Sequence, residues 1–182
     1  MAQAELRAPE IPENWLNDHT QYQQCFVCGR RNDAGLDLYY RQEGDEIVTD
    51  FTGKAEHQGF PGVVHGGLLA TILDETMGRT ALFSRTWVMT GRLEARFRNP
   101  APVGAKLTCR ARLTRGRTSS FESRAEIALE DGTVLADARG LFLRVPDEVR
   151  EQAALTHPDL ADFFNSMPDG DPPGRKRRAP KP

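Results

Sequence analysis

The sequence of 182 residues lacks the features of a membrane, secreted or nucleic-acid-binding protein. No stretch approaches the roughly 20 consecutive apolar residues that a spanning helix needs, and the N-terminus has no apolar signal region. Its three cysteines, Cys25, Cys28 and Cys109, are too few for a disulfide scaffold and fit a reducing compartment. We therefore expect a soluble, cytoplasmic protein with no membrane partner.

An excess of positive charge is also missing from most of the chain. The net charge is −2, but the last eight residues hold five of the 24 basic residues and none of the 26 acidic ones. Residues 1–174 therefore carry 19 basic against 26 acidic residues, a net charge of −7. An acidic body with a basic tail argues against a nucleic-acid partner.

Composition divides the chain into four segments, and the length fits one folded domain. Residues 1–24 are polar and form an N-terminal arm, whereas residues 25–146 carry the regular apolar patterns of the domain. We expect a short helical extension over 147–167. The last segment, 168–182, is dominated by Pro, Gly and charge, which predicts a disordered basic tail.

Apolar periodicity predicts the order of elements inside the domain. Two β-prone runs, 36–42 and 46–52, flank a turn at Gly44 and indicate a hairpin. Over 66–83 the apolar residues recur at helical spacing, which predicts one helix of roughly 18 residues. Its expected buried stripe is Leu69, Ile72, Leu73, Thr76 and Met77.

Three further segments, 88–97, 105–113 and 121–129, alternate with period two and predict strands. A last strand is expected over 133–145, after the Asp131-Gly132 turn, and the short links between the strands favour antiparallel neighbours. In the segment 88–97, the expected apolar row is Met89, Gly91, Leu93, Ala95 and Phe97, with Thr90 in the opposite row. A single helix can bury its stripe only if a curved sheet wraps around it. We therefore predict an α+β fold with about six antiparallel strands around one long central helix.

The candidate catalytic groups lie in one segment, residues 57–78, with the sequence HQGFPGVVHGGLLATILDETMG. His65, Gly66 and Gly67 stand where the loop meets the helix, so backbone N–H groups there lack intrahelical partners. Adjacent glycines let a ligand oxygen approach these donors, which is the geometry of an oxyanion hole. Asp74 lies further along the helix, on a face lined by small residues. The alternative is a solvated surface charge, but the small-residue lining favours a cleft.

This motif, with an acidic residue nine positions after the histidine, resembles the PaaI-like acyl-CoA thioesterases of the hotdog fold, in the 4-hydroxybenzoyl-CoA thioesterase superfamily. The similarity covers about residues 25–145 and includes the opening CFVCGRRNDAGLDL. The resemblance implies hydrolysis of an acyl-CoA to free acid and CoA, with Asp74 as nucleophile or general base. Gly67, or its neighbour Gly66, would hold the thioester oxygen, and Thr90 would help to position water. Coenzyme A is part of the substrate, so no separate cofactor is implied.

Gly67 and Asp74 are seven residues apart, roughly 10 Å along one helix. One thioester cannot easily touch both, so we expect the pair to come from two subunits of a homodimer. Hotdog thioesterases assemble as dimers that often pair into tetramers, and the sequence leaves both states open.

Two rival functions differ in testable ways. Hydroxyacyl dehydratases of the same fold place a carboxylate fourteen residues after a histidine, but His57 plus fourteen is Thr71, which favours hydrolysis. A hotdog protein that binds acyl-CoA without turning it over is the alternative from another class. We expect His57 to line the substrate loop and His65 to shape the start of the helix.

For each of the remaining candidate residues, a structural role is an alternative to a functional one. Arg115 and Arg117 could bind CoA phosphates or lie in a solvated turn. Glu75 is four residues before Arg79, which predicts an ion pair rather than catalysis. The Cys25-x2-Cys28-Gly element suggests zinc, but tetrahedral zinc needs four ligands and too few are available. We predict free thiols and no metal.

Overall fold

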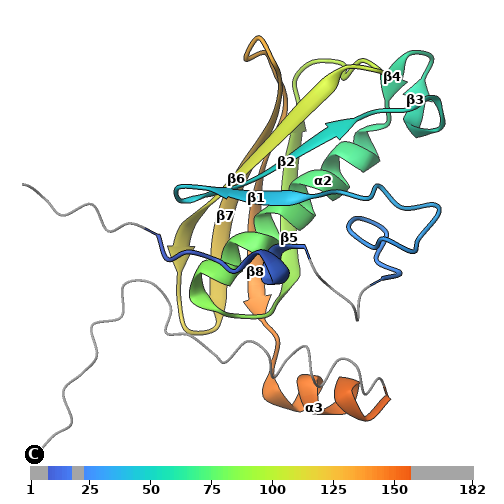
Figure 1. Ribbon diagram of the computed structural model, residues 1–182. Coiled ribbons are helices and arrows are strands. Elements are labelled where there is room, and N and C mark those ends of the chain that lie inside the picture. Colours follow the sequence, from blue (N-terminus) through green and yellow to red (C-terminus); the bar gives the residue numbers. More distant parts are fainter. Residues whose placement is uncertain (1–7, 18–22, 157–182) are drawn as a thin grey trace, which may run out of the picture.

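The computed structural model describes residues 8–17 and 23–156. Six of its strands form one antiparallel sheet in the order β1-β2-β6-β7-β8-β5 (Figure 1). Their bounds are β1 Tyr40–Glu43, β2 Glu46–Thr52, β5 Val88–Phe97, β6 Lys106–Gly116, β7 Ser120–Leu129 and β8 Val134–Arg144. Each coincides with a predicted segment to within a few residues. The predicted α+β class and the six-stranded sheet are confirmed.

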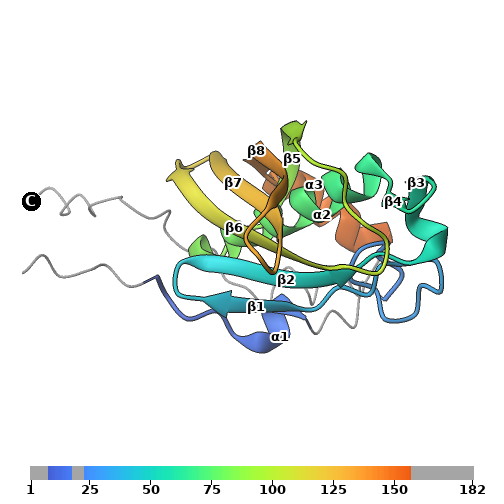
Figure 2. The ribbon, with the colours of Figure 1, turned by 90° about the horizontal axis from the view of Figure 1, so that it is seen from above.

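The central helix α2, Gly66–Arg79, lies against one face of this sheet, which curves around it (Figure 2). All five residues of the predicted stripe are buried. The α-helix ends at Arg79, and residues 80–84 continue as the 3-10 helix η2, Thr80–Ser84. The hydroxyl of Thr80 bonds to the carbonyl of Met77 and to Ser123 of β7. These bonds tighten the last turn, so the α-helix is four residues shorter than predicted.

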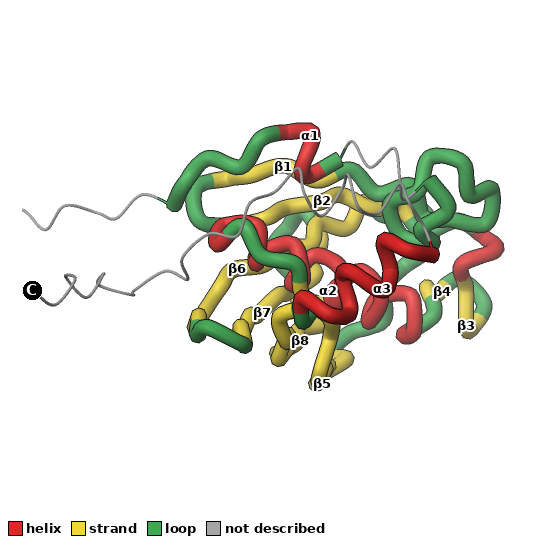
Figure 3. Tube along the Cα trace, turned by 90° about the horizontal axis from the view of Figure 1, so that it is seen from below, coloured by secondary structure: helices red, strands yellow, loops and turns green. Residues whose placement is uncertain are grey.

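The other elements flank this core. The 3-10 helix η1, Ala55–His57, and the hairpin of β3, Gln58–Phe60, and β4, Val63–Val64, directly precede α2. The short helix α1, Glu13–Leu16, contacts β1, and α3, Asp147–Thr156, follows β8 (Figure 3). Ile11 and Leu16 are buried, so part of the predicted arm packs on the core. The predicted tail, 168–182, and residues 157–167 of the extension lie outside the described residues.

The strand β5 departs from its predicted alternation. It pairs only with β8 and forms one edge of the sheet. The register shifts between Thr90 and Arg92, so a bulge lies at Gly91. Before the bulge Val88 packs on the core and Met89 is 57% exposed, whereas after it Leu93 and Ala95 pack on the core. The predicted single apolar row is therefore wrong at Met89, because a bulge switches the face to which side chains point. Phe97, at the end of the strand, is also 57% exposed.

No helix in the described ranges combines the length and apolar character needed to span a bilayer.

Candidate active site

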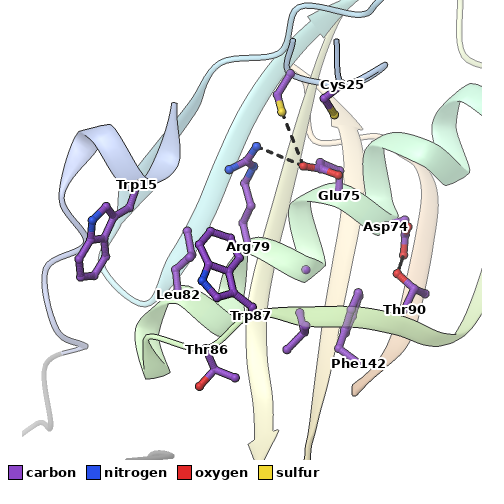
Figure 4. A pocket seen from close by; sticks show the side chains of 13 residues that line it. Trp15, Cys25, Asp74, Glu75, Arg79, Leu82, Thr86, Trp87, Thr90 and Phe142 are labelled. Carbon is purple, nitrogen blue, oxygen red and sulfur yellow. Dashed lines mark hydrogen bonds and ion pairs between the residues drawn. The ribbon is translucent and has the colours of Figure 1, made fainter. Parts of the chain in front are cut away.

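Asp74 and Thr90 meet between α2 and the edge strand β5. Asp74 projects from the middle of α2 toward β5, and its Oδ1 accepts a hydrogen bond of 2.9 Å from the hydroxyl of Thr90 (Figure 4). Burial raises the pKa of the Asp74 carboxyl, and the Thr90 hydrogen bond partly opposes that rise. The Gly91 bulge follows directly after Thr90. The structure therefore joins two residues that the sequence proposed separately.

This carboxylate lies in a pocket between α2, β5 and the N-terminal segments. Gly78 of α2, Phe142 of β8, Trp87 and Val88 line it. Its lining also includes Cys25, Cys28 and Trp15 of the N-terminal segments. The pocket thus combines apolar side chains with a carboxylate, the kind of lining that is typical of ligand sites. The sequence did not predict which residues line this pocket, because most of them come from segments outside the motif at residues 57–78.

The start of α2 has a different environment. His65 is the N-cap residue, and its Nδ1 accepts a hydrogen bond of 2.9 Å from the N–H of Gly67. The N–H of Leu68 donates to the carbonyl of His65. Within the part of the chain that the structure describes, the N–H of Gly66 donates to no acceptor. His65 thus shapes the helix start as expected, and Gly66 is better placed than Gly67 to donate to a ligand.

Gly66 borders a second hollow, separate from that of Asp74. Its lining comes from the β3–β4 hairpin, the first residues of α2 and the end of β5, including Phe60, His65 and Phe97. A Cβ built on Gly66 would lie 3.4 Å from the Phe97 ring, so this edge residue borders the helix start. Gly66 and Asp74 are eight positions apart, roughly 12 Å along the helix. One chain therefore carries the two predicted halves of the site in two places.

The remaining predicted substrate contacts lie outside both hollows. His57 stacks on Phe51, and its Nδ1 accepts from the N–H of Lys54 at 3.1 Å, which closes the turn before β3. Arg115 lies 3.8 Å from Glu122 on the neighbouring strand. The N–H of Arg117 donates to Ser120 across the β6–β7 turn. The structure gives each of these residues a local role, and their contact with substrate stays a prediction.

Glu75 forms the predicted ion pair. Its Oε1 lies 3.1 Å from a guanidinium nitrogen of Arg79, which is buried and also donates to the carbonyl of Leu16. The Arg79 guanidinium stacks over the ring of Tyr40 at 4.1 Å. Burial raises the pKa of the Glu75 carboxyl, and the charge of Arg79 opposes this rise. These contacts assign Glu75 and Arg79 to anchoring the N-terminal segment on α2.

Comparison with known proteins shows what the chain is similar to. Residues 61–136 match the profile of the "Thioesterase superfamily". The chain is 34% identical over 114 residues to acyl-coenzyme A thioesterase THEM4 of Rattus norvegicus, covering 61% of this chain and 49% of the relative. It thus spans about half the length of the curated relatives it matches.

Solved structures agree at the level of the fold. The crystal structure of a thioesterase superfamily protein is 26% identical, with a TM-score of 0.63, covering 78% of this chain and 72% of that one. The Escherichia coli PaaI protein, from a phenylacetic acid degradation operon, has a TM-score of 0.62 at 19% identity. The match covers 74% of this chain and 94% of the PaaI chain. The predicted resemblance to the PaaI-like hotdog thioesterases is confirmed.

Proposed function

We propose that this protein hydrolyses acyl-CoA thioesters to a free acid and coenzyme A, with Asp74 as the catalytic carboxylate. One observation carries the proposal: a partly buried carboxylate, held by Thr90, lines a pocket on the helix whose N-terminus presents the Gly66 N–H. A carboxylate and an oxyanion donor are the two groups that acyl transfer to water needs. The acyl-coenzyme A thioesterases to which the chain is similar support the same chemistry.

The two groups come together if the protein is a homodimer joined along β5. This strand is a sheet edge with unpaired backbone groups and exposed apolar side chains, which favours pairing with another strand. One end of β5 holds Thr90 beside Asp74, and the other end holds Phe97 beside Gly66. Antiparallel pairing of two copies about a two-fold axis places the Thr90 end of one strand next to the Phe97 end of its mate. Each interface would then contain two composite sites.

Within such a site, the chemistry follows from the charges. The Gly66 N–H of one subunit, at the positive end of α2, would stabilise the thioester oxygen as it becomes negative. Asp74 of the other subunit would either take a proton from an attacking water or attack the carbonyl carbon itself, forming an anhydride that water then opens. Both routes convert thioester and water into carboxylic acid and CoA thiol. No metal or redox cofactor takes part in this scheme.

The direct test is release of free thiol from a panel of short-chain, aromatic and long-chain acyl-CoAs, together with the mass of the protein in solution. We expect hydrolysis of at least one class by a dimer or a dimer of dimers. A monomer at assay concentration, or binding of every acyl-CoA without thiol release, would contradict the proposal. The second result would instead identify an acyl-CoA-binding protein.

Replacing Thr90 should change the pH dependence of hydrolysis. The Thr90 hydrogen bond favours the charged form of Asp74, so Thr90→Val should raise the Asp74 pKa further. Because the reactive form is the carboxylate, activity is lost as pH falls through this pKa. The acidic limb of the kcat/KM profile should therefore move to higher pH in Thr90→Val and stay near the wild-type position in Thr90→Ser, which keeps the hydroxyl. Equal pH profiles for the two variants would show that the Thr90 hydroxyl does not lower the pKa of Asp74.

A further inference from the structure

The wall of the Asp74 pocket contains a pair of cysteines that the proposed hydrolysis does not use. Cys25 is half-buried and Cys28 is 6% exposed, and both line the pocket. Their Sγ atoms and a carboxylate oxygen of Glu75 all lie within 4.8 Å of one another. Cys28 Sγ is 3.9 Å from Glu75 Oε1, the oxygen that also pairs with Arg79 (Figure 4). Close thiols in a Cys-X-X-Cys element are the arrangement of redox-active cysteine pairs.

The loop that carries the cysteines is tightly defined. The N–H of Gly29 donates to the carbonyl of Cys25 at 2.9 Å, closing the turn around the pair. A side chain at Gly29 would lie 2.5–2.6 Å from backbone atoms of Gln23 and Cys25, so only glycine fits. Two backbone bonds, from Leu36 and Leu38 to the residues between the cysteines, fasten the turn to the chain before β1. The short separation of the thiols is therefore a built feature of the fold.

The two sulfur atoms differ in environment. The N–H of Val27 donates to Cys25 Sγ at 3.4 Å. The hydrogen bond from the Cys28 thiol is the main cause that lowers the pKa of Cys25 to about 5, with help from backbone N–H groups and Arg79. The same bond and burial raise the pKa of Cys28. At neutral pH this gives a partly accessible thiolate beside a protonated, buried thiol, the arrangement of an attacking and a resolving cysteine.

We propose that Cys25 and Cys28 form a redox-active dithiol that reduces low-molecular-weight disulfides and becomes an intramolecular disulfide. The Cys25 thiolate attacks one sulfur of the small disulfide, whose S–S bond breaks and releases one thiolate. Cys28 then loses its proton and attacks Cys25 Sγ, forming the Cys25–Cys28 bond. The second small thiol leaves with the proton from Cys28. The small disulfide gains two electrons and the cysteine pair loses two.

The surroundings of the cysteine pair favour this redox role over the zinc site that the Cys-x2-Cys spacing suggests. Cys25, Cys28 and Glu75 form the only three-ligand group within the described part of the chain, one short of a closed tetrahedral set. The charge of Arg79 on Glu75 Oε1 competes with a cation for that oxygen. Disulfide formation, in contrast, leaves the Glu75–Arg79 ion pair intact.

The experiment treats the reduced full-length protein with glutathione disulfide and follows its intact mass and the sites of modification. Wild type should lose two hydrogens, retain no glutathione and recover with dithiothreitol. Cys28→Ser should accumulate one glutathione on Cys25, because the resolving thiol is absent. Cys25→Ser should react at least roughly tenfold more slowly, because its remaining thiols are protonated. Cys109→Ser is the matched control, since burial raises the pKa of Cys109 to about 12 and it should behave like wild type.

Three results would overturn the proposal. These are an inert wild type, a stable glutathione adduct on wild type, and equal reaction rates in the Cys25 and Cys28 variants. Stoichiometric zinc in the purified protein, lost on replacing either cysteine, would show a metal site instead. None of these readouts depends on thioester hydrolysis, so the dithiol can fail while the proposed function stands.

Discussion

Replacing Asp74 with Asn should lower kcat for thioester hydrolysis by roughly 10²–10⁴-fold, the range for loss of a positioned base. The amide keeps the shape of the side chain, and its oxygen can still accept the hydrogen bond from Thr90. It cannot take a proton from water at neutral pH, nor attack a carbonyl carbon as a carboxylate does. The loss should therefore fall on the chemical step, with substrate affinity little changed.

This variant also separates an enzyme from a binding protein. Thiol release gives kcat and KM, and calorimetry with a non-hydrolysable thioether analogue gives the affinity. Equal thermal midpoints of Asp74→Asn and wild type would show that the fold is unchanged. Activity within a few-fold of wild type in a folded Asp74→Asn would contradict the assignment. Absence of thiol release even from wild type, with tight analogue binding, would favour the non-catalytic alternative.

Most of the fold could be predicted because its signals are local in the sequence. The stripe that includes Leu69, Leu73 and Met77 repeats at helical spacing, and these residues are buried as predicted. Alternation over β6 and β7 likewise matches their burial. The bulge at Gly91 has no such signal, because it arises from how β5 pairs with β8. That bulge decides the position of Thr90 relative to Asp74, so the contact needed the structure.

Only the part of the candidate site that lies on the helix α2 could be predicted from the sequence. The spacing of Gly66, Gly67 and Asp74 predicted the proposed donor and the proposed catalytic carboxylate on α2, but it did not distinguish the two glycines. The distinction depends on the rotamer of His65, whose Nδ1 takes the N–H of Gly67. Similarly, Cys25 and Cys28 were expected to be free thiols in a structural turn. Their contact with Glu75, about fifty positions away, joins segments that share no local pattern.

Removing the Gly66 N–H should be the second large loss of activity. Gly66 is the first residue of α2, where proline fits the helix and only deletes a donor without an intrahelical partner. His65 already has φ −62° and ψ 132°, the extended conformation that a residue before proline prefers. Gly66→Pro should thus keep the fold and lower kcat by roughly 10²–10³-fold, as for other oxyanion-hole donors. Gly66→Ala, which keeps the N–H and places its Cβ 3.4 Å from Phe97, is the control.

Combining the two inactive variants tests the composite site itself. In a heterodimer of Asp74→Asn and Gly66→Pro chains, one of the two sites pairs an intact Asp74 from the second chain with an intact Gly66 from the first. The other site carries both defects. Two differently tagged chains, co-expressed and purified through both tags, should therefore regain about half of wild-type kcat per dimer. If each chain built its own site, every site would keep one defect, and the heterodimer would be as inactive as its parents. Thiol release from the doubly purified species thus decides between the two arrangements.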